Sequence, residues 1–430
     1  TTLQRDTSGV PTSITSPDGI VTGLTVDGNN HLTQVTLPDT TNFSFTYDQN
    51  GGGLMTDEYD QNNNHFVHVF DGGGKVTDVD DPEGGTWDYE RTVDSEGNVT
   101  TKVLTGEGNL TTYVDRTEST GAFTSTKTGP DGSISTVSRE SDGITETHEL
   151  SCGMTLERKY DIDSEYAYEY LKDSTQSTPS GLERLTTNSK TYDDTNADEI
   201  PDLITDTVTI NGKSWTSANN ILIGEITNTS PLNRVATVNY NMTNLQTEEI
   251  GVTGLHSTTF SYDTRGRLTG ITTDTRTSTR DYDANGHLDY IITPDNKTYD
   301  YTFDVMGRLT HEDRPEGVSI DYDYDSNGNM TLLVTPESFS HTFDYTSNDQ
   351  RKDYTPPISG SYAYVFDKER KLKTLTFPTG SQIQNTYTDG LLTNTLTPEN
   401  SIDFTYECTS KLSGATMGTE AIAYTYDGPL

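Results

Sequence analysis

Apolar and polar side chains alternate along short stretches of this chain, and turn-forming residues bound each stretch. In residues 318–324 the sequence VSIDYDY places Val, Ile and two Tyr at every second position, with Ser and Asp between them. A period of two is typical of a β-strand with one dry face and one wet face. A Pro-acid-Gly corner precedes this strand, and an Asp-x-x-Gly corner and a short returning strand follow it. The pattern predicts a β-hairpin, and no sustained helical periodicity is found.

This hairpin pattern recurs about every 21 residues. The residue before the Asp-x-x-Gly corner anchors each unit, and in the last third of the chain the anchors are Tyr262, Tyr282, Phe303, Tyr324, Tyr345, Phe366, Tyr387, Tyr406 and Tyr426. The corner prolines Pro294, Pro315, Pro336, Pro357 and Pro378 keep the same period and stay in phase with the anchors. A single hairpin is marginal in water, so the units must stack and bury one another's aromatic faces.

The predicted fold class is therefore all-β, built from repetitive antiparallel β-hairpins of about 21 residues. The repeats are regular in residues 1–95 and 260–430, and they are longer and irregular in residues 96–259. No low-complexity linker or composition break is found, so we expect one continuous body over residues 1–430. Because the sequence ends within a repeat, we expect it to be a fragment of a longer chain.

Composition narrows the classes of function. The chain has 67 acidic and 28 basic residues and a formal charge of −39, so it repels nucleic acid and anionic membranes. Only 30% of its residues are hydrophobic, which argues against a thick apolar core. No stretch is apolar for long enough to predict a transmembrane segment. Cys152 and Cys408 are far apart in the sequence, and we expect buried free thiols rather than a disulfide.

The repeat resembles a known family. The segments YDTRGRLTGI, from Tyr262, and FDVMGRLTHE, from Phe303, are similar to the signature of the Rhs/YD-repeat family. The resemblance is most specific over residues 260–430. It implies a long β-sheet that spirals into a hollow shell or an elongated solenoid-like body, as in teneurins and the encapsulating components of toxin complexes. The final DGPL does not match the closing self-cleavage motif of toxin shells, so no protease activity is carried over.

These observations favour a non-enzymatic structural protein of a secreted or cell-surface assembly, such as a shell, fibre or adhesion scaffold. One alternative is an encapsulating shell segment whose toxic cargo lies outside this chain, and another is a carbohydrate-binding surface module. We expect self-association through exposed sheet edges or with neighbouring protomers, and glycans or cell-surface proteins are further candidate partners. Nucleic acid is not an expected partner.

One acidic loop carries the pattern of a calcium site. Taking Asp194 as the first position, alternate residues offer oxygen ligands, and Ile200 offers its backbone carbonyl. The candidate ligands are Asp194, Asn196, Asp198, Ile200, Asp202 and Asp206. Glu199 stands where such loops usually have Gly, and Thr205 stands where they have an acid, so that Asp206 would substitute one place late. The loop is therefore either a Ca²⁺ site or an acidic surface hairpin.

No catalytic residue is predicted. Paired carboxylates such as Asp321 and Asp323 recur with the hairpins, which is typical of a solvated outer face rather than of a glycosidase cleft. The eight histidines form no recognisable nucleophile motif with a Ser or Cys. The Gly-rich stretches lack the context of a phosphate loop and indicate hairpin tips, so no organic cofactor is expected.

Overall fold

The computed structural model describes residues 1–48, 52–196, 198–407 and 410–424. The anchor Tyr426 and the thiol of Cys408 lie outside the described residues. All regular structure in the described part is β-strand, and no helix is found there, as the sequence predicts.

The described residues form 39 strands, whose bounds are as follows. They are β1 (Thr2–Arg5), β2 (Pro11–Thr15), β3 (Val21–Val26), β4 (Leu32–Thr36), β5 (Asn42–Tyr47), β6 (Met55–Tyr59), β7 (His65–Phe70), β8 (Val76–Asp80), β9 (Thr86–Val93), β10 (Val99–Thr105), β11 (Leu110–Thr117), β12 (Phe123–Thr128) and β13 (Ile134–Arg139). The next are β14 (Thr145–Leu150), β15 (Thr155–Ile162), β16 (Glu169–Ser177), β17 (Glu183–Asp193), β18 (Leu203–Ile210), β19 (Lys213–Asn220), β20 (Glu225–Thr229), β21 (Val235–Tyr240), β22 (Thr247–Val252), β23 (Thr258–Tyr262), β24 (Leu268–Thr273), β25 (Arg276–Tyr282) and β26 (Leu288–Ile292). The last are β27 (Thr298–Phe303), β28 (Leu309–Arg314), β29 (Val318–Tyr324), β30 (Met330–Val334), β31 (Ser340–Tyr345), β32 (Arg351–Thr355), β33 (Tyr362–Phe366), β34 (Leu372–Thr376), β35 (Gln382–Thr388), β36 (Leu391–Leu396), β37 (Ser401–Glu407), β38 (Lys411–Met417) and β39 (Glu420–Ala423).

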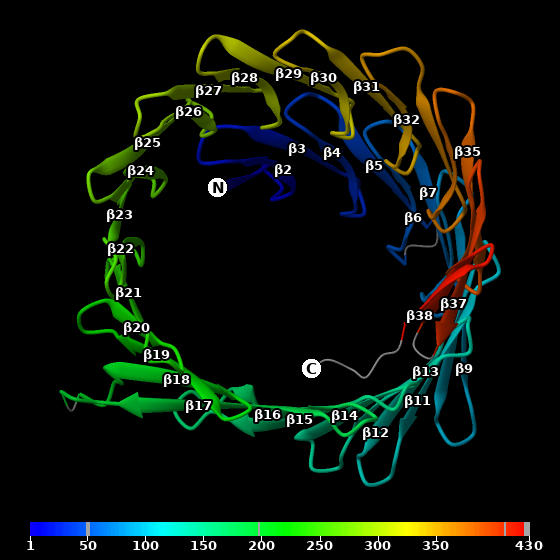
Figure 1. Cartoon of the computed structure of the whole chain (residues 1–430), viewed down its shortest axis with the longest axis horizontal. Coiled ribbons are helices and arrows are strands. Elements are labelled where there is room, and N and C mark those ends of the chain that lie inside the picture. The colour runs from blue at the N-terminus through cyan, green and yellow to red at the C-terminus, as the bar shows by residue number, and fades with distance from the viewer. Residues whose placement is uncertain (49–51, 197, 408–409, 425–430) are drawn as a thin grey trace.

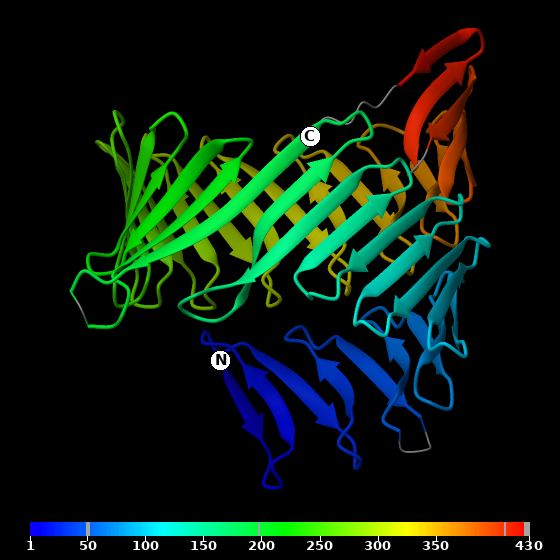
Figure 2. The same ribbon diagram turned by 90° about the horizontal axis from the view of Figure 1, so that it is seen from below.

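These strands form one open sheet in which each strand pairs antiparallel with the next along the chain. The sheet winds round a central space and passes one full turn, so that its last third lies beside its N-terminal strands (Figure 1, Figure 2). The predicted all-β stack of antiparallel hairpins and its spiral form are confirmed.

Each regular hairpin contains one β-bulge, and the anchor residue lies at the bulge. Asp323 pairs with Leu332 and Tyr324 pairs with Met330, so Thr331 is left without a partner in the ladder. The same shift occurs at ten other residues, namely Val26, Tyr47, Phe70, Tyr262, Tyr282, Phe303, Tyr345, Phe366, Tyr387 and Tyr406. A bulge bends its strand and increases its twist, so one bulge in each unit curves the sheet repeatedly in the same sense.

The anchor tyrosines join each unit to the unit before it. The hydroxyl of Tyr324 donates to the backbone carbonyl of Leu309, at 2.8 Å. Leu309 is the first residue of the preceding returning strand, and the same bond recurs in six further units at 2.7–3.0 Å. Tyr therefore serves this wall better than a purely apolar residue, since its ring packs while its hydroxyl bonds to the neighbouring backbone.

The Asp-x-x-Gly-Arg corner has a similar linking role. Asp304 Oδ1 accepts the backbone N–H groups of Met306 and Arg308, at 2.9 and 3.0 Å. The Nε of Arg308 donates to Asp304 Oδ2 at 2.6 Å, and its guanidinium lies 5.2 Å from the ring centre of Tyr324 in the next unit. Burial acts to raise the pKa of Asp304, but these hydrogen bonds outweigh burial and lower the pKa. Gly307 has a φ of 80°, which a side chain would strain.

The wall is one sheet thick and has almost no conventional core. Ile320, at 9% exposure, is the one buried hydrophobic residue among those described. Large apolar side chains such as Val365 and Val93 remain more than half exposed. The prediction of a thin core is confirmed, and packing along the sheet replaces packing between layers.

The prediction of free cysteines is wrong for Cys152, which is disulfide-bonded. Separation in the sequence was a poor guide because the spiral brings remote residues together. Ser410 Oγ, for example, donates to Asp131 Oδ2 at 2.8 Å.

Candidate functional site

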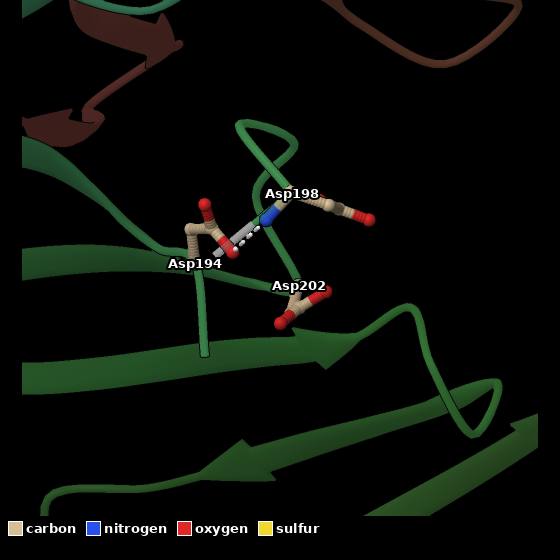
Figure 3. Close-up of side chains that lie close together, drawn as sticks. All are labelled: Asp194, Asp198 and Asp202. Carbon is tan, nitrogen blue, oxygen red and sulfur yellow. Dashed lines mark hydrogen bonds between the residues drawn. The ribbon is translucent and has the colours of Figure 1, made fainter. Parts of the chain in front are cut away.

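The predicted calcium loop lies between β17 and β18, and the structure brings three of its residues together. One carboxylate oxygen from each of Asp194, Asp198 and Asp202 lies within 4.8 Å of the others (Figure 3). Asp202 is 3% exposed and accepts hydrogen bonds from the backbone and hydroxyl of Thr195, at 2.8 and 2.6 Å. Asn196 donates to the same carboxylate from its backbone and its side chain, at 3.0 and 3.1 Å.

This carboxylate already has a structural role in the loop. The hydrogen bond from the Thr195 hydroxyl, with others from the backbone N–H groups, lowers the pKa of Asp202 against the effect of burial. The Oδ1 of Asn196 accepts the backbone N–H of Asp198 at 2.9 Å. Glu199 adopts a φ of 70° at the sharp bend, where such loops usually have Gly. The calcium site therefore stays a prediction.

The structure places one predicted ligand, Asp206, apart from the acidic cluster, and it bonds the backbone of another, Ile200, to a member of the cluster. Asp206 lies within β18, opposite Lys190 of β17, and its carboxylate forms an ion pair with that lysine at 3.1 Å. Ile200 is 59% exposed, and its backbone N–H donates to Asp198 Oδ1 at 2.9 Å. Ala197, in the middle of the loop, lies outside the described residues.

A larger polar site joins the two turns of the spiral, and we call it the seam. On the first turn it consists of the hairpin corners at residues 16–19, 37–40, 60–63, 81–84 and 105–108. On the second turn it consists of the corners at 263–266, 283–286, 304–307, 325–328, 346–349 and 367–370. The sheet pairings run between consecutive strands, so hydrogen bonds and ion pairs at these corners hold the turns together.

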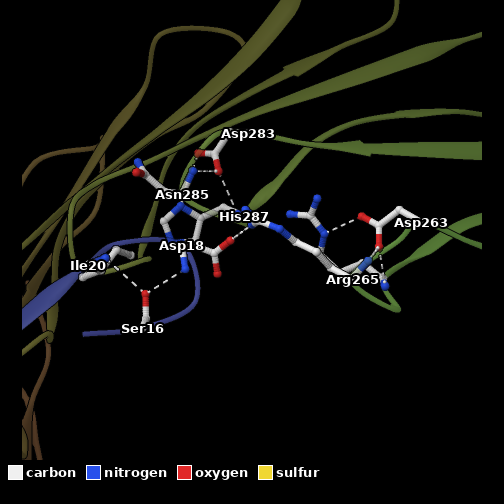
Figure 4. A network of polar contacts seen from close by, with 9 residues as sticks. Ser16, Asp18, Ile20, Asp263, Arg265, Asp283, Asn285 and His287 are labelled. Carbon is white, nitrogen blue, oxygen red and sulfur yellow. Dashed lines mark hydrogen bonds and ion pairs between the residues drawn. The ribbon is translucent and has the colours of Figure 1, made fainter. Parts of the chain in front are cut away.

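At one end of the seam, an ion pair links the turns. Arg265 Nη1 contacts Asp18 Oδ1 (Figure 4). Each partner is fixed by its own corner, since Ser16 Oγ accepts the backbone N–H of Asp18 at 3.2 Å and Asp263 Oδ1 accepts that of Arg265 at 2.8 Å. In the adjoining unit, Asp283 holds its corner by accepting the backbone N–H of Asn285 at 2.9 Å.

Further along, amide side chains replace the arginine. Asn327 Nδ2 donates to Asp60 Oδ2 at 2.7 Å, and Asn327 Oδ1 accepts the backbone N–H of Asn62 at 3.1 Å. Asp60 is 9% exposed and also accepts the backbone N–H groups of Asn62 and Asn64, at 2.9 and 2.8 Å. One carboxylate thus closes its own corner and bonds to the next turn.

The most buried contact of the seam involves Asp81, whose side chain is 1% exposed. Its Oδ1 accepts the backbone N–H groups of Glu83 and Gly85, at 3.0 and 2.8 Å. Its Oδ2 accepts Asn348 Nδ2 at 2.8 Å and the guanidinium of Arg370 at 3.2 Å, both from the second turn. A buried carboxylate is costly without hydrogen-bond donors. Since two of the donors to Asp81 come from the second turn, this contact favours one alignment of the two turns.

Glutamates also link the two turns. Here the carboxylate on one turn accepts a backbone N–H group of the other turn. Glu83 Oε1 accepts the backbone N–H of Ser347 at 2.7 Å, and Glu107 Oε1 accepts that of Lys368 at 3.0 Å. From the second turn, Glu369 accepts Asn109 Nδ2 at 2.6 Å. Burial acts to raise the pKa of Glu369, but hydrogen bonds, led by that from Lys371, outweigh burial and lower it.

Residues that meet across the seam lie between 247 and 289 positions apart in the sequence. Sequence reasoning did not find them, although the Pro-acid-Gly corners and the Asp-x-x-Gly corners were recognised as separate features. Three of the five first-turn corners contain the predicted proline, as in Pro17, Pro38 and Pro82. The missing information was which corner on one turn lies against which corner on the next.

A one-layer wall of hairpins that winds past a full turn and closes through its corners defines a spiral shell type of structural protein. The sequence matches the family model of the Teneurin YD-shell over residues 1–430, and the chain belongs to this family. The Rhs/YD-repeat resemblance is thereby confirmed. No curated protein matches the sequence.

The solved structures that match this chain include the following three. A crystal structure of TcdB2-TccC3 without its hypervariable C-terminal region has a TM-score of 0.49 and 13% identity, covering 96% of this chain and 25% of that one. The TcdB2-TccC3-Cdc42 structure has a TM-score of 0.48 and 12% identity, covering 97% and 24%. The Photorhabdus luminescens Tc holotoxin pore has a TM-score of 0.34 and 11% identity, covering 94% and 31%. This chain spans about a quarter to a third of the length of these structures.

Among the described residues, the structure contains no helical segment with the length and hydrophobicity that a membrane span requires.

Proposed function

We propose that this chain is a non-enzymatic wall segment of a secreted or cell-surface assembly, in which the spiral encloses space or forms part of an adhesion scaffold. The observation that carries this proposal is the seam. Corner-to-corner bonds allow a sheet with almost no core to continue as a closed wall of more than one turn. Membership of a YD-shell family supports the structural role.

Self-association follows from the edge of the first strand. Among the described residues β1 pairs with β2 alone, and all four residues of β1 are exposed. An unpaired strand edge is a template for a strand of another chain. We therefore propose contact with further protomers at this edge, for which Leu3→Pro provides a test because proline removes a donor and bends the strand.

Negative-stain electron microscopy of the purified chain tests the wall proposal. We expect curved, ring-like particles, alone or joined end to end. The double variant Asp60→Ala/Asp81→Ala is expected to yield opened arcs, while Asp71→Ala, in a corner that lacks seam contacts among the described residues, preserves the rings. Compact globules from the unmodified chain would contradict the proposal, as would rings that persist unchanged in the double variant.

For the acidic loop we propose a Ca²⁺ ion bound by Asp194, Asp198 and Asp202, with Asn196 as a neighbouring oxygen donor. The convergence of three carboxylates supports this proposal. Calcium is expected to raise the melting temperature and a chelator to lower it, and Asp198→Ala should abolish the difference. Asp206→Ala serves as the control, because the ion pair of Asp206 with Lys190 keeps it away from the cluster. Identical melting curves with and without calcium would exclude the site.

A further inference from the structure

One corner of the seam brings a lysine, a carboxylate and a side-chain amide into contact. Glu369 Oε2 accepts the ammonium group of Lys371 at 2.6 Å, and Glu369 Oε1 accepts Asn109 Nδ2 at 2.6 Å. Lys371 and Glu369 belong to the second turn, whereas Asn109 belongs to the first and lies 260 positions from Glu369 in the sequence. One carboxylate therefore bridges an amine on one turn and an amide on the other.

The lysine stands at a position that differs between units. In the units that contain Gly-Arg-Leu, the residues are Arg267 and Arg308, whose guanidinium groups pair with the corner aspartate and lie over the tyrosine ring of the next unit. Lys371 also lies over such a ring, 5.4 Å from the centre of Tyr387. Unlike arginine, lysine can lose its proton in a protein, and its neutral amine is a nucleophile. This corner therefore carries a group that can react where other units carry an inert one.

The three groups are held together and are partly shielded from water. The side chain of Glu369 is 11% exposed and that of Lys371 is 29% exposed. Lys371 Nζ also donates to the carbonyl of Gly390 at 2.8 Å, and the hydroxyl of Thr105 donates to Glu369 Oε1. A Cβ added at Gly390 would lie 3.4 Å from Lys371 Nζ and 4.0 Å from Asn109 Nδ2, so both nitrogens lie near the bare backbone of this glycine. The amine and the amide are thereby confined to one small site.

We propose that Lys371 and Asn109 form an amide crosslink between the two turns, with Glu369 as the proton carrier. The carboxylate takes a proton from the ammonium group, and the freed amine attacks the side-chain carbonyl carbon of Asn109, Cγ. A bond forms between Nζ and Cγ, the bond between Cγ and Nδ2 breaks, and Glu369 delivers the proton to the departing nitrogen. Nζ loses two protons in all, and they leave with that nitrogen as ammonium. Atoms and charge balance without an oxidant or a cofactor.

The hydrogen bonds of Glu369 place it where a proton carrier must be. Both of its contacts lie within the reach of general acid–base catalysis, which is roughly 2.6–3.2 Å. Although burial acts to raise the pKa of Glu369, its hydrogen bonds lower it, so the first proton transfer is uphill. The reaction is therefore a slow event that each chain undergoes once, as suits a crosslink rather than an enzyme.

A covalent bond at this point suits a wall that has almost no core. The described polar contacts between the turns are hydrogen bonds and ion pairs, which water and salt weaken where they are exposed. An amide between Asn109 and Lys371 prevents the turns from separating while the sheet between them stays intact. This inference holds whether the wall encloses space or forms an adhesion scaffold.

Mass spectrometry of the purified, denatured chain tests this assignment, on fresh material and after a week of storage. We expect an intact mass lower, by one ammonia molecule, than the mass calculated from the sequence. Digestion should release a branched peptide that joins the segments around Asn109 and Lys371. Lys371→Arg, which keeps the charge, and Asn109→Ala should each show the full calculated mass. Glu369→Gln should also show the full mass, since an amide cannot carry the proton.

Lys102→Arg is the matched control. The ammonium group of Lys102 pairs with Glu90 at 2.9 Å, and both residues lie in the paired strands β9 and β10 of the first turn, so this variant should still lose ammonia. Circular dichroism of Glu369→Gln should retain the β-sheet spectrum, which separates lost chemistry from lost folding.

Three outcomes would overturn the assignment. The first is the full calculated mass in the unmodified chain, both fresh and after storage. The second is a loss of ammonia that digestion assigns to a linear peptide, as from cyclisation of an asparagine that precedes glycine, such as Asn211. The third is a loss of ammonia that persists in Lys371→Arg.

Discussion

Gly85 is the position where a single methyl group should open the seam. A Cβ added at Gly85 would lie 2.5 Å from the backbone carbonyl oxygen of Lys368, on the second turn, and 2.6 Å from Asp81 Oδ2. Its φ lies outside the left-handed region, so the backbone itself permits alanine. The cost of Gly85→Ala therefore falls on the contact between the turns and on the carboxylate of Asp81, which closes the same corner and bonds to the second turn.

The size of the effect follows from these distances. Ordinary van der Waals contact begins at 3.4 Å, so the carbonyl of Lys368 must retreat by about 0.9 Å. Forcing one extra methyl group into a packed site costs about 1–3 kcal/mol. The shift also stretches the bond between Glu107 and the backbone N–H of Lys368, which is 3.0 Å long. We expect the closed seam to be destabilised by that amount.

Hydrogen–deuterium exchange with mass spectrometry measures this destabilisation locally, which suits a repeat array whose unfolding is not two-state. In Gly85→Ala, peptides containing the backbone N–H groups of Ser347 and Lys368 should exchange roughly 5- to 150-fold faster. Gly72→Ala is the matched control, because nothing lies within 4 Å of its added Cβ and its φ is also permissive. Unchanged exchange at both peptides in Gly85→Ala would refute the view that the turns touch here.

Two further predictions concern single units of the wall. Tyr324→Phe removes the hydroxyl that bonds to Leu309, so we expect folding to persist but the unit to lose about 1–2 kcal/mol, measured as faster amide exchange in β28 and β29. Identical exchange rates would show that the hydroxyl is dispensable. A hydrogen bond with Asp88, burial and the charges of Asp80 and Asp88 raise the pKa of Asp78 to about 6. The folded chain then holds more protons than the unfolded chain between about pH 4 and pH 6, and this contribution to stability is lost as pH rises through about 6. Asp88→Asn should therefore raise the melting temperature more at about pH 7.5 than at about pH 5, and equal shifts at both would contradict the assignment.

The repeat unit could be predicted from the sequence because its causes are local. Alternation in residues 318–324 predicted the strand that the structure contains as β29, from Val318 to Tyr324. The anchor Tyr324 was identified from its spacing alone, and it proves to lie at the bulge, where its hydroxyl reaches the preceding unit. Turn chemistry, strand periodicity and aromatic spacing all act within about 21 residues, so one sequence window contains them.

The seam and the disulfide could not be predicted because they depend on the winding of the whole spiral. Whether Asp60 meets Asn327 is decided by the summed bend and twist of all the hairpins between them. A small error in the bend or twist predicted for each hairpin would add up along the chain and would place Asp60 opposite a different corner of the second turn. The acidic loop shows a further reason why sequence reasoning failed. The spacing of oxygen-bearing residues grouped Asp206 with Asp194, whereas the pairing of β17 with β18 places Asp206 beside Lys190.

The absence of a second turn beside the middle of the chain gives a physical reason for its longest strands. The described contacts between the two turns lie within residues 16–131 and 263–410, and the strands there are mostly five to seven residues long. Between them the wall is a single turn high (Figure 2), and it contains the two longest described strands, β16 of nine residues and β17 of eleven. A longer strand makes more ladder bonds with each neighbour, which offsets the missing contact with a second turn. Exchange in β16 and β17 should therefore stay unchanged in Gly85→Ala, while the units that border the seam lose their protection.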